Sequence, residues 1–216
     1  MAMKLKFKNQ EFQEAATAAV CDVFNGQPYH DPNKYTVDPG VKKEVSSLGV
    51  TEAQSLPGLE VLTQTTMDFQ DEPDVGYKNA EIELLPADLQ KNLHEVQDRQ
   101  NLEHSKGGAL GDRALPELEV EMETGTGKTF VYIKTIFELN KRYGWSKFII
   151  IVPGIAIREG VKKSLDIMSD KFLADYGKTA KAYVYNSAHP QDVLDFSTNA
   201  DIQVLVMNVQ AFNARS

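Results

Sequence analysis

Hydrophobic positions recur at helical spacing near the start of the chain. Between residues 10 and 24, apolar side chains return every three or four positions, which predicts an amphipathic helix. Asn25 and Gly26 then interrupt the pattern, because both residues favour turns. A thinner stripe predicts a second helix over residues 86–103; its members are Leu89, Leu93 and Val96.

Two polar segments lie around the second predicted helix. Residues 25–75 contain five prolines and only short apolar stretches, such as residues 59–62, so they predict a long, loop-rich segment with room for one hairpin. Residues 105–114 contain three glycines and predict a loop. We therefore expect residues 1–115 to form a helix followed by a mixed, loop-rich extension.

Strands and helices alternate from residue 115 onward. The continuous apolar run at 147–152 predicts a strand buried on both faces. The alternation favours the α/β class, with a parallel sheet and flanking helices over residues 116–216. The predicted strands cover 118–122, 147–152, 181–186 and 202–209, and the predicted helices cover 128–142 and 155–168.

Composition excludes several classes of protein. The 216 residues are 42% hydrophobic and 25% charged, which is typical of a globular domain. No apolar run is long enough for a transmembrane helix and the N-terminus does not resemble a secretory signal, so we expect a cytoplasmic protein with no membrane partner. Cys21 is the only cysteine, which excludes an internal disulfide and a multi-cysteine zinc site.

Charge is distributed unevenly between the two parts. The net charge of −8 arises within residues 1–115, whereas residues 116–216 carry equal numbers of acidic and basic side chains. Nucleic-acid-binding proteins usually carry a positive field, which this chain as a whole lacks. Any DNA contact is therefore expected to be local or to depend on a larger assembly.

A glycine-rich turn between a predicted strand and a predicted helix is the strongest chemical signal. In the stretch Glu123-Thr124-Gly125-Thr126-Gly127-Lys128-Thr129, the glycines allow backbone amides to surround a phosphate group. The Lys128 ammonium would reach the β- and γ-phosphates of ATP, and the Thr129 hydroxyl would bind Mg²⁺. We expect the nucleotide contacts to come from Thr124, Gly125, Thr126, Gly127, Lys128 and Thr129. The alternative, a glycine-rich turn without a ligand, is disfavoured by the Gly-Lys-Thr sequence in this context.

The sequence around this turn resembles the Res subunit of type III restriction–modification enzymes. The resemblance is strongest over residues 118–163 and extends to residues 3–20, 79–97 and 206–214. Met122 stands where the common phosphate-loop pattern has its first glycine, as in superfamily 2 helicases. The resemblance implies an incomplete RecA-like P-loop domain of an ATP-dependent DNA translocase. In the family, this motor is joined to a nuclease domain, acts on double-stranded DNA and works with a modification (methyltransferase) subunit.

The resemblance also implies roles for residues outside the loop. Gln13, in an aromatic-Gln-x-x-Ala pattern, corresponds to a glutamine that recognises adenine, although it could equally be a surface residue of its helix. Residues 152–159 resemble helicase motif Ia, which implies DNA-phosphate contacts from Pro153, Gly154 and Arg158. The alternative for this segment is an ordinary strand-to-helix turn in which Arg158 pairs with Glu159.

One expected element of such a motor does not follow the loop. No apolar strand ending in Asp-Glu occurs after residue 129, so we expect an N-terminal fragment that binds ATP weakly and hydrolyses it negligibly. The sheet is then expected to have an open edge. A second hypothesis remains open, in which the chain is an interaction module for the methyltransferase partner and its nucleotide loop is vestigial.

Overall fold

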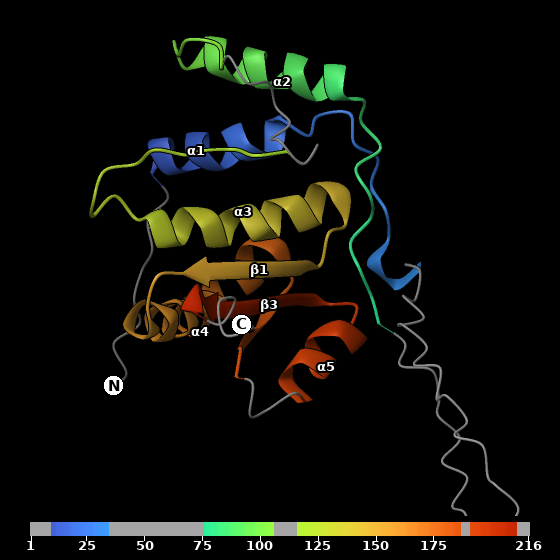
Figure 1. The fold of residues 1–216 in the computed structure, drawn as a ribbon, viewed down its shortest axis with the longest axis vertical. Coiled ribbons are helices and arrows are strands. Elements are labelled where there is room, and N and C mark those ends of the chain that lie inside the picture. The colour runs from blue at the N-terminus through green and yellow to red at the C-terminus, as the bar shows by residue number, and fades with distance from the viewer. Residues whose placement is uncertain (1–9, 35–75, 106–115, 187–190, 211–216) are drawn as a thin grey trace, which may run out of the picture.

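The computed structural model describes residues 10–34, 76–105, 116–186 and 191–210 (Figure 1). No helix in these ranges combines the length and apolar character needed to cross a bilayer. The elements in chain order are α1 (Glu11–Asp22), the 3-10 helix η1 (Pro32–Lys34), α2 (Pro86–Arg99), α3 (Lys128–Tyr143), β1 (Lys147–Val152), α4 (Ile155–Tyr176), β2 (Ala180–Val184), α5 (Gln191–Thr198) and β3 (Ile202–Asn208).

The three strands form one parallel sheet in the order β1-β3-β2. Val204 in the central strand lies opposite Phe148 on one side and Ala182 on the other. Parallel strands need crossover connections. Helix α4 lies in the connection from β1 to β2, and α5 lies in the connection from β2 to its neighbour β3. The predicted α/β class, with a parallel sheet and flanking helices, is confirmed.

The main core lies between one face of the sheet and helices α3 and α4. The rings of Phe137 and Phe172 stack there with their centroids 4.5 Å apart. Each large apolar side chain buried in such a core stabilises the fold by roughly 1.5–3 kcal/mol. The buried members of this core are Phe130, Ile133, Ile136, Phe137, Val152, Val161, Leu165, Met168, Phe172, Ile202, Val204 and Val206.

A second cluster joins α1 and α2 to the carboxyl end of α3. Phe24 packs edge-on against Trp145, with the ring centroids 5.1 Å apart. Helices α2, α1 and α3 therefore form successive layers beside the sheet (Figure 1). The cluster draws residues from both sides of the predicted boundary at 115/116: Ala19, Val23, Phe24, Ala80, Leu89, Val96, Tyr143 and Trp145.

The strand predicted at 118–122 is wrong, because the structure assigns no strand to residues 117–123. A strand requires a hydrogen-bonded neighbour, and this stretch runs past α1 to the start of α3, away from the sheet (Figure 1). Leu118 instead packs against the second cluster, and Val120 is exposed. The alternation of apolar and polar residues at 118–122 is therefore compatible with a strand. Among the described residues, however, no strand pairs with this stretch.

The prediction that residues 147–152 are buried on both faces is also wrong. Ile149 and Ile151 are 55% and 52% exposed. Helices α3 and α4 cover the opposite face, where Phe148, Ile150 and Val152 contribute to the main core. On the face of the two isoleucines, α5 packs against β2 and β3, so the side chains at the β1 edge stay open.

The largest differences from the predicted element boundaries lie at the carboxyl ends of two helices. Helix α4 continues to Tyr176 rather than ending at residue 168, and α2 ends at Arg99 rather than at 103. Helix α5 was not predicted, since an eight-residue helix repeats its apolar stripe too few times to be recognised. The predicted hairpin near 59–62 and most of the glycine loop at 105–114 lie outside the described residues.

Asp22 links the three layered helices through two arginines. Its carboxylate accepts hydrogen bonds from Arg99 of α2 and Arg142 of α3, each at 2.7 Å. Partial burial acts to raise the pKa of Asp22, but the bonds from the two guanidinium groups outweigh it and hold this pKa below its usual value. The charged form of Asp22 is therefore favoured by the fold.

We expect Asp22→Asn to lower stability at pH 7 by about 1–2 kcal/mol. For a chain of this size, that loss corresponds to a fall in Tm of roughly 2–8 °C. Because the folded pKa is depressed, the stabilisation is present above the unfolded pKa of about 3.9 and is lost as pH falls through the folded pKa. Thermal melts from pH 7 to pH 2, with Asp166→Asn as the control, check this. An Asp22→Asn variant whose Tm at pH 7 equals that of the wild type would contradict the prediction.

Candidate functional site

The glycine-rich turn leads directly into the first turn of α3. Gly125 and Gly127 have φ angles of +85° and +90°, a region that side-chain-bearing residues rarely occupy. Between them, the Thr126 hydroxyl donates to the Glu123 carbonyl at 2.7 Å. The two glycines and this hydrogen bond reverse the chain just before α3 begins at Lys128, as the sequence predicted.

The start of α3 presents backbone amides that the helix itself does not use. The first hydrogen bond of the helix runs from the Val131 amide to the Gly127 carbonyl at 3.1 Å, and no side chain caps the helix start. The amides of Lys128, Thr129 and Phe130 therefore have no acceptor within the helix. Such amides, at the positive end of the helix dipole, favour an anion such as phosphate.

Lys128 and Thr129 provide the side chains for such a ligand. Lys128 is exposed, and no carboxylate in the described part of the chain pairs with its ammonium group. Thr129 is partly buried in the first turn of α3. Burial raises the pKa of Tyr132, one turn further along, and the Thr129 side chain acts in the opposite direction. An unpaired ammonium, a hydroxyl and free amides at one helix start are the donor set that fits a triphosphate with Mg²⁺.

Gln13 of α1 lies against the same turn. Its Nε2 donates to the Thr126 carbonyl at 2.9 Å, although the two residues are far apart in sequence. A Cβ atom placed on Gly127 would come within 2.5 Å of that Nε2 atom, so the absence of a side chain at 127 permits the contact. The structure therefore places Gln13 directly against the loop.

An ion pair that the sequence analysis did not identify holds α1 in this position. Lys134 of α3 is buried and donates to the Glu14 carboxylate, one residue after Gln13. A buried charge needs a partner, since its desolvation is otherwise costly. The signal was present, because Lys134 stands between Ile133 and Phe137 on the apolar side of the helix. The pair fixes the part of α1 that carries Gln13.

The residues predicted to contact DNA lie at the connection between β1 and α4. Pro153 is exposed and Gly154 is the extended N-cap of α4. The Arg158 guanidinium contacts Glu159 at 3.2 Å, the pairing considered as the alternative to a DNA contact. The end of β1 and the first turn of α3 lie at the same end of the molecule (Figure 1).

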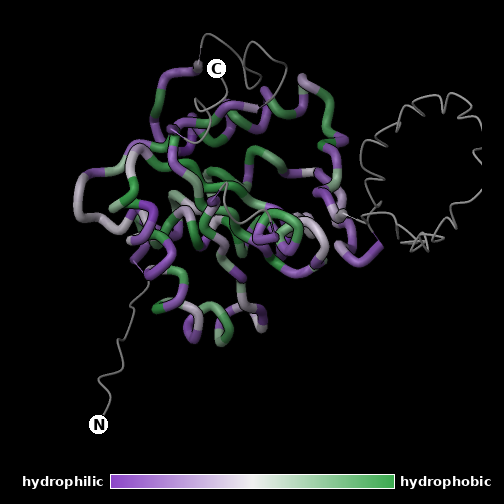
Figure 2. Tube along the Cα trace, turned by 60° about the horizontal axis from the view of Figure 1, so that its bottom comes forward, coloured by the Kyte–Doolittle hydropathy of each residue, from purple (hydrophilic) through white to green (hydrophobic). Residues whose placement is uncertain are grey.

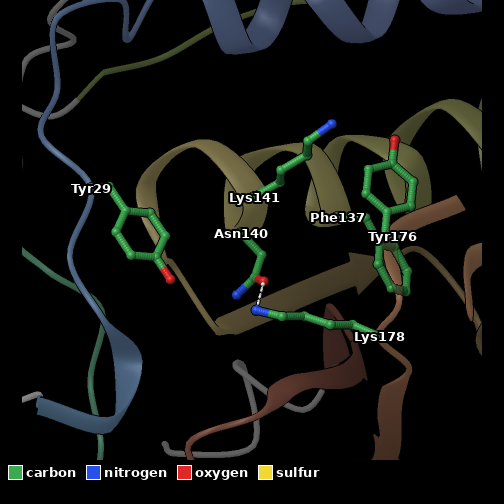
Figure 3. Close-up of a pocket in the computed structure, with 6 residues that line it drawn as sticks. All are labelled: Tyr29, Phe137, Asn140, Lys141, Tyr176 and Lys178. Carbon is green, nitrogen blue, oxygen red and sulfur yellow. Dashed lines mark hydrogen bonds between the residues drawn. The ribbon is translucent and has the colours of Figure 1, made fainter.

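A separate hollow of about 230 Å³ lies toward the carboxyl end of α3 (Figure 3). Lys178 donates to the buried Oδ1 of Asn140 at 2.9 Å across its floor. Lys141 lies in the last turn of α3, where a cation offsets the negative end of the helix dipole, and Lys178 follows the Gly177 cap of α4 and binds Asn140. We therefore assign these lysines a structural role. The lining residues are Tyr29, Phe137, Asn140, Lys141, Tyr176 and Lys178.

We expect Gly127→Ala to be more destabilising than Gly125→Ala. Both changes place a side chain at positive φ, at a cost of about 1–2 kcal/mol. Only Gly127→Ala also pushes the Gln13 amide off Thr126, because nothing lies near a Cβ at Gly125. The additional loss is expected to be about 1 kcal/mol.

A double-mutant cycle in urea tests this coupling. Gln13→Ala should cost about 1 kcal/mol in the wild-type chain and almost nothing in the Gly127→Ala background. Additive losses would show that the contact between Gln13 and the loop does not contribute.

Comparison with known proteins places the chain in a family. Residues 87–216, more than half of the chain, match the family described as "Type III restriction enzyme, res subunit". The EcoPI Res subunit of Escherichia phage P1 and the EcoP15I Res subunit of Escherichia coli are each 36% identical over 155 residues. These alignments cover 64% of this chain and 16% of each relative.

A third relative, the StyLTI Res subunit of Salmonella typhimurium, is 33% identical over 117 residues, which cover 46% of this chain and 12% of the relative. The chain thus spans about a sixth or less of the length of these curated relatives. The matched region contains the glycine turn, α3 and the three-stranded parallel sheet, the arrangement of a partial RecA-like domain. The chain belongs to the Res-subunit family of type III restriction enzymes.

Proposed function

We propose that this chain is the ATP-binding part of a Res subunit, an ATP-dependent DNA motor used in restriction. The observation that carries the proposal is the pair of positive-φ glycines, Gly125 and Gly127, directly before the uncapped start of α3. This backbone can direct several amides at one phosphate tail. Lys128 would neutralise the β- and γ-phosphates, and Thr124 and Thr126 would contribute their backbone amides.

Mg²⁺, when bound, would offset the negative charge of the phosphate groups. Thr129 is the protein ligand that the loop offers to it.

Gln13 is proposed to recognise the adenine base. Its amide uses one N–H for the Thr126 carbonyl, which leaves a second N–H and the side-chain oxygen for a ligand. Adenine offers a matching acceptor and donor, since N7 accepts and the N6 amino group donates. One side chain would then hold the base and contact the phosphate loop.

The DNA and protein partners are proposed from the family. The relatives are named as Res subunits of restriction–modification enzymes, which favours double-stranded DNA and a modification (methyltransferase) subunit as partners. Pro153, Gly154 and Arg158 are proposed to contact DNA phosphates. Because Arg158 now pairs with Glu159, DNA binding would require that this surface pair opens.

Mg-ATP should raise the Tm of this chain, and Lys128→Ala should abolish the rise. At about 100 times its Kd, a ligand adds roughly 2.7 kcal/mol of stability, or about 5–10 °C for this chain length. Differential scanning fluorimetry measures the shift, with Lys162→Ala on α4 as a matched control. Phosphate release should stay near background, because no Asp-Glu pair follows the loop in the 216 residues. A shift that persists in Lys128→Ala contradicts the proposed site.

Gln13→Ala should reduce the preference for ATP over GTP. Guanine carries an acceptor where adenine has its amino group, so the Gln13 oxygen would face another oxygen. Loss of the Thr126 contact affects both nucleotides alike, which makes the ratio of their Kd values the informative quantity. We expect the ratio to fall roughly tenfold, the effect of about 1.4 kcal/mol. Gln97→Ala on α2 is the control, and an unchanged ratio argues against base recognition by Gln13.

A further inference from the structure

Helix α5 lies on the open face of the sheet without burying any of its residues. Val193 and Leu194 are each 37% exposed. Its aromatic residue, Phe196, meets Tyr183 of β2 edge-on with the ring centroids 6.5 Å apart. A helix this short is not stable by itself, so its position depends on the few contacts that it makes with the rest of the chain.

In the described residues, the hydrogen bonds that join α5 to the rest of the chain lie at its carboxyl end. The Lys147 ammonium donates to the Phe196 carbonyl at 2.6 Å and also to the Asn199 carbonyl. The Tyr77 amide donates to the Ser197 carbonyl at 2.7 Å. A cation at this end also opposes the negative end of the helix dipole.

Lys147 is held firmly in this position. Its ammonium lies 5.5 Å from the centre of the Phe196 ring and 6.0 Å from that of Tyr77. Burial lowers its pKa to about 8, while Asp201 acts in the opposite direction, so the group is mainly charged at neutral pH. The Asn79 side chain also binds the amide and carbonyl of Lys147, which fixes its backbone.

Beyond the row of Lys147, Gln203 and Lys181, the sheet face beneath α5 is apolar and continues onto the open part of β1. Tyr183 and Leu205 are opposite each other in the register, and both are buried. In the same register, Leu205 is opposite Ile149, and Met207 is opposite Ile151. The exposed Ile149 and Ile151 therefore lie on the same face of the sheet as the covered Tyr183 and Leu205.

We propose that α5 is a detachable cover, held at its carboxyl end by Lys147, that closes part of an apolar sheet face. When it opens, Tyr183 and Leu205 join Ile149 and Ile151 in one exposed surface. Regions with few buried contacts open at a low free-energy cost while the rest of the fold stays intact. The opening does not involve the glycine turn, so it is independent of the proposed nucleotide binding.

Hydrogen–deuterium exchange of the 216-residue chain tests this proposal. Lys147→Met keeps the apolar stem but removes both carbonyl contacts, and α5 amides should then exchange at least about tenfold faster, the effect of about 1.4 kcal/mol. Amides of α3 should be unchanged. Lys147→Arg retains donors and charge and should protect α5 like wild type. Lys162→Met, at an exposed lysine on α4, is the matched control.

Three results would overturn the proposal. The first is wild-type protection of α5 in Lys147→Met, and the second is an equal effect of Lys162→Met. The third is faster exchange in α3 as well as α5, which would show that Lys147 supports the whole fold rather than a separate cover. Adding Mg-ATP to Lys147→Met should leave α5 exchange unchanged even if α3 becomes better protected.

Discussion

The packing of α3 between α1 and the sheet is the constraint on which the candidate site depends. One side of α3 contributes Phe130, Ile133 and Phe137 to the core beneath the sheet. On another side of the helix, the buried Lys134 forms an ion pair with Glu14 of α1. A helix held on both sides cannot rotate without losing a core contact or leaving a buried charge unpaired. Its first turn, and the amides there, are therefore fixed relative to Gln13.

The hydropathy of the chain shows how this layer is built (Figure 2). Hydrophobic segments gather in the interior, and hydrophilic ones lie mainly on the outer turns of the helices. Polar contacts then fix how the layers lie against each other, through Asp22 and its arginines at one end of α1 and through Gln13 and Glu14 at the other. The acidic half of the chain thus contributes directly to the position of the loop.

The two sheet faces differ in how completely they are covered. Helices α3 and α4 bury the face of Phe148 and Ile150, whereas the small helix α5 covers the other face only in part. The same alternation that gives β1 a buried side therefore leaves Ile149 and Ile151 in solvent. An apolar run predicts that a strand forms, but not which of its faces receives a helix.

The sequence alone determined the local structure and the chemistry of the loop. Helical periodicity located α1, α2 and α3, apolar runs located the three strands, and Gly-Lys-Thr located the helix start with its lysine and hydroxyl. These features depend on neighbours within a few residues, so they can be predicted without the rest of the fold. Only the tertiary structure decided that residues 118–122 have no strand partner, that Lys134 pairs with Glu14 and that Arg158 turns to Glu159. Strand pairing and the burial of a charge depend on groups distant in the chain, and their positions are set by the packing of the whole molecule.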